Sequence, residues 1–473
     1  MRRHGFLVAA VLAGGALAAG CDRKTQDSQP WAESPASDTV PTETGDTSLE
    51  QEPRAPSGER DLEEVAGFLA WPTGEPWVGE FTGDGADDYL FAVGAYTVVA
   101  GPLTGSLDFT GDVEAVVSLG AAESDWHVSD IAIGHVAGEE YSDAVFSGLY
   151  SYHSGGAAYL YHGAGLHDRV LGDDAIGDAP DATLLYDGEE QAFGSSASAG
   201  DLDADGYDDL LLGSPNRWSV YDGAVYLFMG PIVGTIGADE ADTIFTEATT
   251  VDHLGWSVDL HGDFDADGMK DAVMDATNGL FVFDGPAPSG GVDVTEADSV
   301  LSPYGFPCED MTVGDLDGDG HDDLVLGLYD AHAVWVFPGP LAPAFTLDEA
   351  GVYIEHRQSY SRFGVSASLE QDLDADGRDD LVVGAPDAFW EGMAGGAYVF
   401  YGPLEGSLDD ADADALLRVR YSGEHSFQGP GWVAPGGDVN QDGYEDFFVS
   451  ALFAGGAAND SYWRTYAVFG GVR

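Results

Sequence analysis

The stretch Asp201-Leu-Asp-Ala-Asp-Gly-Tyr-Asp-Asp-Leu210 decides the fold, because its pattern recurs along the chain. The pattern is D-x-D-x-D-G-x-x-D followed by apolar residues. It returns at 263–271, 315–323, 372–380 and 438–446, the last with Asn440 at the third position. Such repetition is not a chance occurrence. Carboxylates packed this densely would repel one another strongly unless a cation lay between them.

Each copy predicts a calcium loop. The side chains at positions 1, 3, 5 and 9 supply oxygens, the backbone carbonyl at position 7 adds another, and glycine at position 6 allows the positive φ that turns the loop back. The predicted ligand residues are Asp201, Asp203, Asp205, Tyr207 and Asp209; Asp263, Asp265, Asp267, Met269 and Asp271; Asp315, Asp317, Asp319, His321 and Asp323; Asp372, Asp374, Asp376, Arg378 and Asp380; and Asp438, Asn440, Asp442, Tyr444 and Asp446.

The acidic loops have two other interpretations. A single Asp-Gly turn can be a plain hairpin connection without an ion, but five dense copies favour calcium. An EF-hand needs Glu at position 12 and flanking helices. Position 12 is apolar in every copy, as in Leu212 and Val383, and lies in a short apolar run typical of a strand. The sequence therefore predicts calcium loops within β-hairpins.

Two weaker copies come first. The segment 80–88 keeps Glu80, Thr82, Asp84 and Asp88 at the ligand positions and predicts a weak metal site. The segment 135–143 keeps too few ligands to bind an ion.

The repeated unit indicates a β-propeller. Around each loop lie an apolar strand, a second strand, a variable connection and a third strand, usually closed by Gly-Pro. A unit of about four strands cannot bury both of its faces alone, which is typical of a propeller blade. The seven loops, starting at 80, 135, 201, 263, 315, 372 and 438, therefore predict an all-β, seven-bladed β-propeller over 61–473.

These repeats resemble the FG-GAP repeats of the integrin α-subunit propeller. The resemblance rests on Phe193-Gly194, the loop 201–209 and Gly213-Ser214-Pro215, and on Phe363-Gly364, the loop 372–380 and Gly384-Ala385-Pro386. It covers roughly 61–473 and implies seven blades, with calcium loops joining strands 1 and 2 of each. In the integrin family the opposite face binds partners.

Closure of the ring can also be predicted. After the last loop, strands are expected only near 446–451 and 466–469, so the final blade lacks its outer strand. The run 62–70 is spare at the other end, and we expect it to pair there.

Composition limits the choice of partners. The 473 residues include 16 Lys and Arg against 85 Asp and Glu, for a formal net charge of −69. Nucleic acids and anionic membrane surfaces would be repelled. The chain is 44% hydrophobic, which is ample for a core, and 66 glycines suit many tight turns.

The N-terminus predicts export. Residues 1–20 carry Arg2 and Arg3, an apolar run and a small-residue cleavage site. Leu-Ala-Ala-Gly-Cys21 resembles the lipobox of bacterial lipoproteins, although Leu17 stands four rather than three residues before the cysteine. This implies lipidation of Cys21 in the cell envelope; an ordinary cleaved signal and secretion are the alternative.

Residues 21–60 are rich in Ser, Thr, Pro and acids, and predict a disordered tether. It would span from roughly 35 Å as a coil to about 130 Å when extended. Cys308 is the other cysteine and has no partner, so no intramolecular disulfide is expected.

The rim opposite the acidic loops is the expected place for ligands. The connections between strands 2 and 3 are long and aromatic, and exposed aromatics beside Arg suit protein or carbohydrate recognition; packing onto the propeller is the alternative. The candidate ligand-binding residues are Tyr152, His153, Arg217, Trp218, Tyr221, Trp390, Tyr462, Trp463 and Arg464.

The function predicted from sequence is a lipid-anchored surface adhesion or protein-interaction module with about five calcium ions. A carbohydrate-binding module, or the propeller part of a polysaccharide-active enzyme, is the alternative. No catalytic constellation is found, neither H-E-x-x-H nor G-x-S-x-G, so the chain is not expected to be an enzyme.

Overall fold

The computed structural model describes part of the chain, in one compact unit within Pro53–Arg473. The described residues are 57–62, 66, 68–71, 76–82, 84–92, 96–103, 105–108, 117–119, 126–138, 141–150, 154–163, 180–187, 192–215, 223–246, 253–277, 279–302, 308, 310–328, 331–390, 393–418, 430–454 and 461–471. The predicted signal segment 1–20, Cys21 and the tether up to residue 56 lie outside them.

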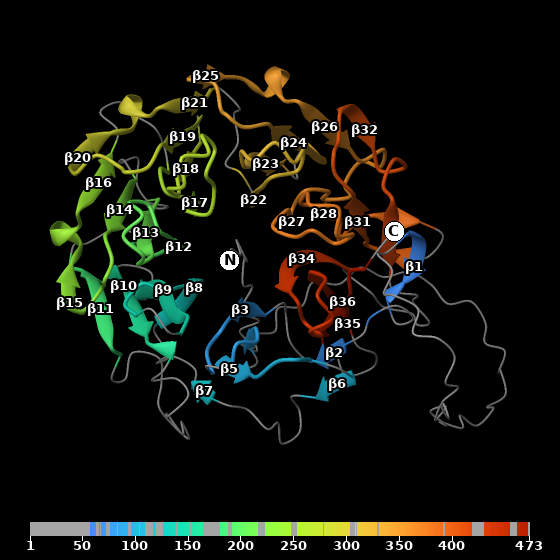
Figure 1. The fold of residues 1–473 in the computed structure, drawn as a ribbon, viewed down its shortest axis with the longest axis horizontal. Helices are drawn as coiled ribbons and strands as arrows, with labels where there is room; N and C mark the ends of the chain where they lie inside the picture. Colours follow the sequence, from blue (N-terminus) through green and yellow to red (C-terminus); the bar gives the residue numbers. More distant parts are fainter. Residues whose placement is uncertain are drawn as a thin grey trace, which may run out of the picture. The chain divides into compact units, whose positions relative to one another are not determined.

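The described strands form seven blades around a central axis (Figure 1). Blade 1 contains β3 (Trp77–Gly79), β4 (Asp88–Ala92), β5 (Tyr96–Val99) and β7 (Val117–Leu119). Blade 2 contains β8 (Trp126–Gly134), β9 (Asp143–Tyr150), β10 (Ser154–Tyr161) and β11 (Ala182–Tyr186). Blade 3 contains β12 (Ser196–Gly200), β13 (Asp209–Ser214), β14 (Ala224–Phe228) and β16 (Thr243–Thr246).

The next four blades repeat this antiparallel order. Blade 4 contains β17 (Val258–Asp259), β18 (Ala272–Ala276), β19 (Gly279–Phe283) and β21 (Ser299–Leu301). Blade 5 contains β22 (Asp310–Gly314), β23 (Asp323–Leu328), β24 (Ala333–Phe337) and β26 (Val352–Glu355). Blade 6 contains β27 (Ala367–Ser368), β28 (Leu381–Gly384), β31 (Ala397–Phe400) and β33 (Ala415–Arg418). Blade 7 contains β34 (Pro430–Gly437), β35 (Asp446–Ala454), β36 (Ser461–Val468) and, from the N-terminal side, β2 (Phe68–Trp71). The predicted all-β, seven-bladed propeller is confirmed.

A fifth strand joins six of the blades, and the sequence did not predict it. In five cases the chain crosses, after strand 3, to the outer edge of the preceding blade and pairs there in parallel with strand 4. In the sixth case the fifth strand comes from the N-terminal segment and pairs in the same way with strand 4 of blade 6. These crossing strands are β15 (Gly234–Gly237), β20 (Gly290–Asp293), β25 (Ala344–Phe345), β32 (Gly406–Asp409), β6 (Gly105–Asp108) and β1 (Gly58–Asp61). The 3-10 helices η1 (Ala238–Glu240), η2 (Val294–Glu296) and η3 (Leu347–Glu349) follow three of them and lead back to strand 4.

The N-terminal segment closes the ring, as predicted. Strand β2 pairs antiparallel with β36, with Phe68 opposite Ala467 and Ala70 opposite Thr465. The strand is shorter than the expected run 62–70. Strand β1 pairs in parallel with β33 of blade 6, with Gly58 opposite Ala415. The propeller therefore begins at about residue 58 rather than 61, and its first residues bind two different blades.

The core lies between neighbouring blades. Strand 2 is the most consistently enclosed, since every residue of β13 and β23 is buried. Apolar side chains of consecutive blades pack together, as Leu227 of blade 3 does with Met274 of blade 4. Val78 and Phe91 of blade 1 pack with Phe448 of blade 7, which completes the circle. In the described parts, none of the helices combines the length and hydropathy needed to span a bilayer.

Candidate metal centre

The acidic loops lie where the sequence predicted them, between strands 1 and 2 of each blade. In the loop 201–209, Gly206 has a φ of 93° and Ala204 a φ of 58°, so two left-handed residues fold the loop back on itself. The corresponding glycines of the other four strong loops have φ between 86° and 91°. The expected role of glycine at position 6 is confirmed, whereas the left-handed residue at position 4 was not predicted.

Backbone N–H groups orient the carboxylate of position 1. The N–H of Asp205 donates to Oδ1 of Asp201 at 3.2 Å, and the N–H of Gly206 donates to Oδ2 at 3.0 Å. The N–H of Asp205 also lies 3.2 Å from Oδ1 of Asp203. The same three contacts recur in the other four strong loops. These hydrogen bonds thus orient the side chains of positions 1 and 3 within the loop.

The buried aspartate at position 9 anchors the loop to the blade. Oδ2 of Asp209 accepts the N–H of Leu202 at 3.0 Å, and Oδ1 accepts the N–H of Gly230, which follows strand 3, at 2.8 Å. Asp271, Asp323, Asp380 and Asp446 make the equivalent pair of contacts. One carboxylate therefore joins the start of the loop, its end and the end of strand 3.

Three carboxylates converge in each of four loops. Their oxygens lie within 4.8 Å of one another in the groups Asp201/Asp203/Asp209, Asp263/Asp265/Asp271, Asp315/Asp317/Asp323 and Asp372/Asp374/Asp380. The fifth strong loop has Asn440 in the corresponding place and the same hydrogen bonds. Oxygen donors at this spacing fit a hard cation such as Ca²⁺, which takes six to eight oxygens.

The aspartate at position 5 does not join these three. Oδ1 of Asp205 accepts the N–H of Tyr207 at 2.9 Å, as Asp267 does from Met269. In the loop 372–380, the other oxygen of Asp376 lies 2.9 Å from Nη1 of Arg378. The ligand role of position 5, and of the position 7 carbonyl, stays a prediction.

The two weaker loops both keep the anchor, and the first also keeps hydrogen bonds to its position 1 carboxylate. Asp88 accepts N–H groups of Phe81 at 2.8 Å and Gly101 at 3.1 Å, and Glu80 accepts those of Thr82 and Gly85. In blade 2, Oδ1 of Asp143 lies 3.2 Å from Nδ1 of His162. A histidine thus accompanies the buried carboxylate in the loop that has the fewest other acids.

Burial governs the electrostatics of the anchors. Loss of solvent, opposed in part by the two backbone N–H groups, raises the pKa of Asp209, Asp271 and Asp323 to about 7, and neighbouring loop carboxylates add to the rise. The pKa of Asp380 and of Asp446 is raised to about 7 in the same way. An ionised anchor is therefore costly in the ion-free protein, and a bound cation would offset that cost.

The predicted ligand-binding residues of the opposite rim are only partly described. Tyr152, His153, Arg217, Trp218 and Tyr221 lie outside the described residues. Trp390 lies in β29 (Phe389–Trp390), which pairs with β30 (Met393–Ala394) in a small hairpin after strand 2 of blade 6.

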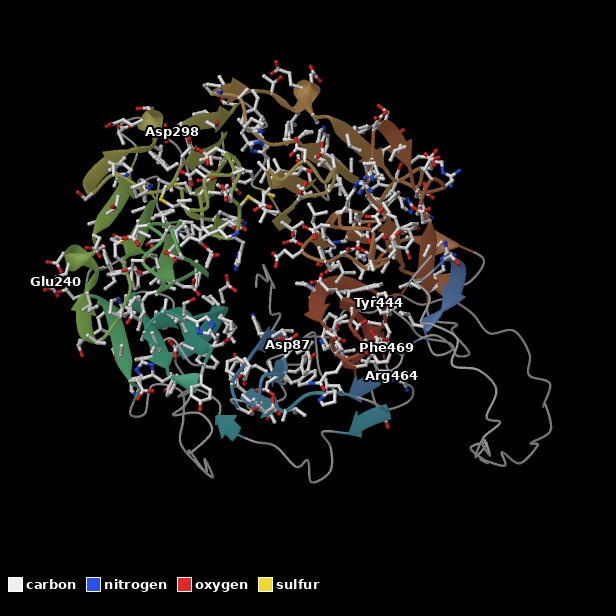
Figure 2. The ribbon with its side chains drawn as sticks, viewed as in Figure 1. Asp87, Glu240, Asp298, Tyr444, Arg464 and Phe469 are labelled. Carbon is white, nitrogen blue, oxygen red and sulfur yellow. The ribbon has the colours of Figure 1, made fainter. Side chains whose placement is uncertain are left out.

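One expectation about this rim is wrong. The sequence predicts Tyr462, Trp463 and Arg464 in a connecting loop, but they lie in β36, where Trp463 pairs with Leu452 (Figure 2 labels Arg464). The strands of blade 7 run further than their sequence suggests because β35 and β36 pair as far as Ala454 and Ser461. The ring of Trp463 packs edge-on against Trp432, with centroids 4.9 Å apart.

The fold and loops together define a β-propeller with one acidic hairpin loop per blade. The FG-GAP repeat model matches residues 193–228, 309–337 and 363–400, which run from near strand 1 to strand 3 of blades 3, 5 and 6. Integrin alpha-5 of Xenopus laevis is 31% identical over 175 residues, 33% of this chain and 16% of that protein. Integrin alpha pat-2 of Caenorhabditis briggsae is 26% identical over 287 residues, 54% of this chain and 23% of that protein.

An enzyme is also among the relatives. Phosphatidylinositol-glycan-specific phospholipase D of Bos taurus is 32% identical over 161 residues, 31% of this chain and 18% of that protein. The chain thus spans less than a quarter of the length of these relatives. With the repeats matched and the fold described, the chain is a seven-bladed β-propeller that contains FG-GAP repeats and is similar in sequence to integrin α subunits.

The raised pKa values of the buried aspartates at position 9 predict how the stability of the ion-free protein depends on pH. Because the folded pKa of about 7 exceeds the ordinary value of 3.8, the folded state holds the anchor protons more tightly than the unfolded chain does. In chelator, the melting temperature should therefore fall as pH rises between about 4 and about 7. Asp323→Asn, which keeps an acceptor and removes the charge, should reduce this fall, and Asp348→Asn in exposed η3 should not. A fall of equal size in all three proteins would contradict the assignment.

Proposed function

We propose that this chain is a calcium-stabilised interaction module held outside the cytoplasm by a lipid anchor. The observation that carries the proposal is the convergence of three carboxylate oxygens within 4.8 Å in each of four hairpin loops of one ring. In the loops of blades 3, 4 and 5, no Lys or Arg of the described residues pairs with these carboxylates, so a cation from solution is the natural partner.

The calcium ions have a structural role in this proposal. They lie at the strand 1–2 turns of the blades, where an ion offsets the repulsion among carboxylates that the fold has already brought together. Extracellular calcium modules bind at about 10⁻⁴ to 10⁻³ M. At about 100 times its dissociation constant, an ion stabilises the folded state by about 2.7 kcal/mol per site.

Interaction with other proteins is proposed from the integrin relatives, and the opposite rim is its proposed place. Strands run antiparallel within a blade, so the connections between strands 2 and 3 lie at the end of the blade away from the acidic loops. Trp390, Trp463 and Arg464 come from those ends of blades 6 and 7. Aromatic residues beside Arg are typical of binding surfaces.

Glycan binding is the second candidate, because the same aromatic side chains suit sugars. The activity named for the phospholipase relative is not transferred, since the chain covers 18% of that protein. Hydrolysis of polysaccharide or phospholipid by the pure protein would replace both binding proposals with an enzymatic one.

Removing one ligand tests the calcium sites. Asp317→Ala should lower the calcium stoichiometry by about one and reduce the rise in melting temperature that millimolar calcium produces, because one loop loses a converging carboxylate. Asp348→Ala removes an exposed acid of the same repeat and should change neither value. Calorimetric titration measures the stoichiometry, and melting with and without chelator measures the stability. Melting that is indifferent to chelator would remove the calcium proposal.

The proposed lipid anchor makes a separate prediction. In a bacterial host, radiolabelled fatty acid should be incorporated into the full chain and lost in Cys21→Ser, because the thiol of Cys21 is the acceptor. Cys308→Ala should keep the label, since Cys308 is buried within blade 5. If Cys21→Ser retained the label, lipidation of Cys21 would be refuted. Secretion of the full chain without any label would favour an ordinary cleaved signal peptide.

Crosslinking in the native envelope tests the rim. Proteins captured by the full chain should be lost when Trp463→Ala and Arg464→Glu are combined, because both changes fall on the proposed surface. Tyr444→Ser, on the acidic loop of the same blade (Figure 2), should keep them. Equal capture by both variants would rule out this rim as the interaction surface. Binding of the full chain to a glycan array, lost in the double variant, would favour glycan binding.

A further inference from the structure

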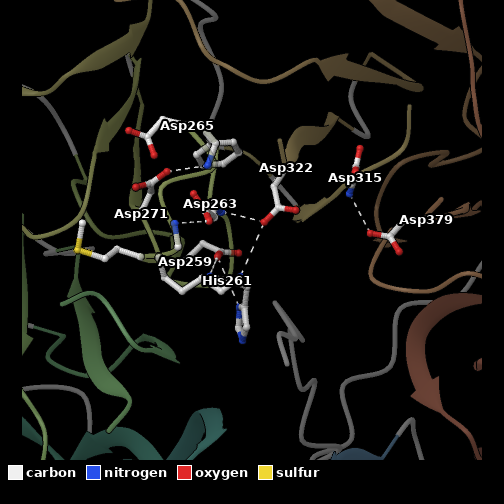
Figure 3. A network of polar contacts seen from close by, with 12 residues as sticks. Asp259, His261, Asp263, Asp265, Asp271, Asp315, Asp322 and Asp379 are labelled. Carbon is white, nitrogen blue, oxygen red and sulfur yellow. Dashed lines mark hydrogen bonds and ion pairs between the residues drawn. The ribbon is translucent and has the colours of Figure 1, made fainter. Parts of the chain in front are cut away.

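The eighth position of the acidic loops lies outside the predicted ligand set, yet it makes a recurring contact between blades. Oδ2 of Asp322, in blade 5, accepts the N–H of Asp263 in blade 4 at 2.8 Å (Figure 3). The N–H of Asp322 donates in return to the carbonyl of Asp263 at 3.1 Å. Asp263 is the first predicted ligand of its own loop. A residue of one loop therefore binds both backbone polar groups at the start of the preceding loop.

The same contact runs through blades 4 to 7 and across the ring closure. Asp379 accepts the N–H of Asp315 at 2.8 Å, and Glu445 accepts that of Asp372 at 2.8 Å. The carboxylate of Asp87 in blade 1 accepts a backbone hydrogen bond from Asp438 in blade 7. The loops at 263, 315, 372 and 438 thus form a series in which each is attached to the next by a carboxylate, here called the seam carboxylate.

The series is broken between blades 3 and 4. Position 8 of blade 4 is Lys270, whose ammonium group cannot accept a hydrogen bond. Its backbone N–H still donates to the carbonyl of Asp201 at 3.0 Å, while its side chain lies 3.8 Å from Oδ2 of Asp322. The loop at 201 therefore receives no seam carboxylate from the blade that follows it.

This arrangement has a consequence for binding. An ion fixes position 1 of its loop, and the hydrogen bonds at that residue also fix position 8 of the next loop, next to the buried anchor at position 9. Fixing the backbone of one residue is equivalent to about a fivefold or larger change in an equilibrium constant. Neighbouring bound ions repel one another, but salt screens that repulsion over about 8 Å at 0.15 M ionic strength, and it does not remove hydrogen bonds.

We propose that the seam carboxylates couple the candidate calcium sites of blades 4 to 7, so that an ion in one loop strengthens binding in the next, and that Lys270 isolates the site of blade 3 from this series. The inference rests on the proposed calcium binding. Asp322, Asp379 and Glu445 act as positioning residues and do not touch the ion.

One variant with an internal control tests the coupling. Asp265→Ala weakens the site of blade 4 in the full chain, and hydrogen exchange of loop peptides during a calcium titration at 0.15 M salt reports each site separately. The calcium concentration that half-protects the loop at 315 should rise about fivefold, because Asp322 joins the two loops. The loop at 201, which borders blade 4 on its other side, should not change. In chelator, an unchanged melting temperature of the Asp265→Ala variant shows that the substitution acts locally and does not destabilise the fold.

Two substitutions of Asp322 test whether its carboxylate carries the coupling. Asp322→Ala removes the acceptor and should abolish the effect of Asp265→Ala on the loop at 315, whereas Asp322→Asn keeps an acceptor oxygen and should preserve it. The coupling would be overturned if calcium protects both loops but Asp265→Ala leaves the half-protecting calcium concentration at 315 unchanged, or raises that at 201 equally. The calcium sites themselves would remain. Protection that never depends on calcium in the unaltered chain would overturn the proposed calcium binding, and the coupling with it.

Discussion

One buried carboxylate per blade is the constraint on which the rest of the structure depends. In blade 3 it is Asp209, which accepts the N–H of Leu202 and that of Gly230. The equivalent aspartate is present in every blade, including the two whose loops are poor in ligands. In blade 1, Asp88 makes the same two contacts, and in blade 2, Asp143 accepts the N–H of Ala137, one position further along the loop, and that of Gly163. A buried carboxylate is tolerated only where hydrogen bonds or charges satisfy it. The aspartate therefore fixes three pieces of backbone together before any ion is considered.

The ring is held by contacts that cross from blade to blade. Apolar residues of neighbouring blades share one core, and each crossing strand covers an edge that would otherwise expose unpaired N–H and C=O groups. The N-terminal segment serves both purposes at the closure, since β1 pairs with blade 6 and β2 completes blade 7. The closure thus depends on segments far apart in sequence, since β1 and β2 pair with β33 and β36.

The two rims have different chemistry for a physical reason. Turns between strands 1 and 2 are short and fixed by their own hydrogen bonds, so they suit a repeated ion site. The opposite ends vary in length: β35 has 9 residues and β9 has 8, whereas β4, in the blade between them, has 5. Blades 7 and 2 thus extend further than blade 1 on that side, and a surface that varies from blade to blade is where specificity can develop.

Sequence by itself determined the number of blades, the place of the acidic loops and the residues within them, because these depend on local spacing that repeats. The glycine at position 6 and the spare N-terminal strand could be predicted for the same reason. Only the tertiary structure decided that β1 and the other crossing strands pair with preceding blades, that Tyr462–Arg464 continue a strand, and that position 8 contacts the neighbouring loop. The crossing strands and the contacts of position 8 depend on hydrogen bonds between residues far apart in sequence, such as Asp263 and Asp322, which are 59 positions apart. No local pattern encodes the partner of such a bond, since an acid at position 8 of one loop looks the same in sequence whether it faces solvent or the next blade.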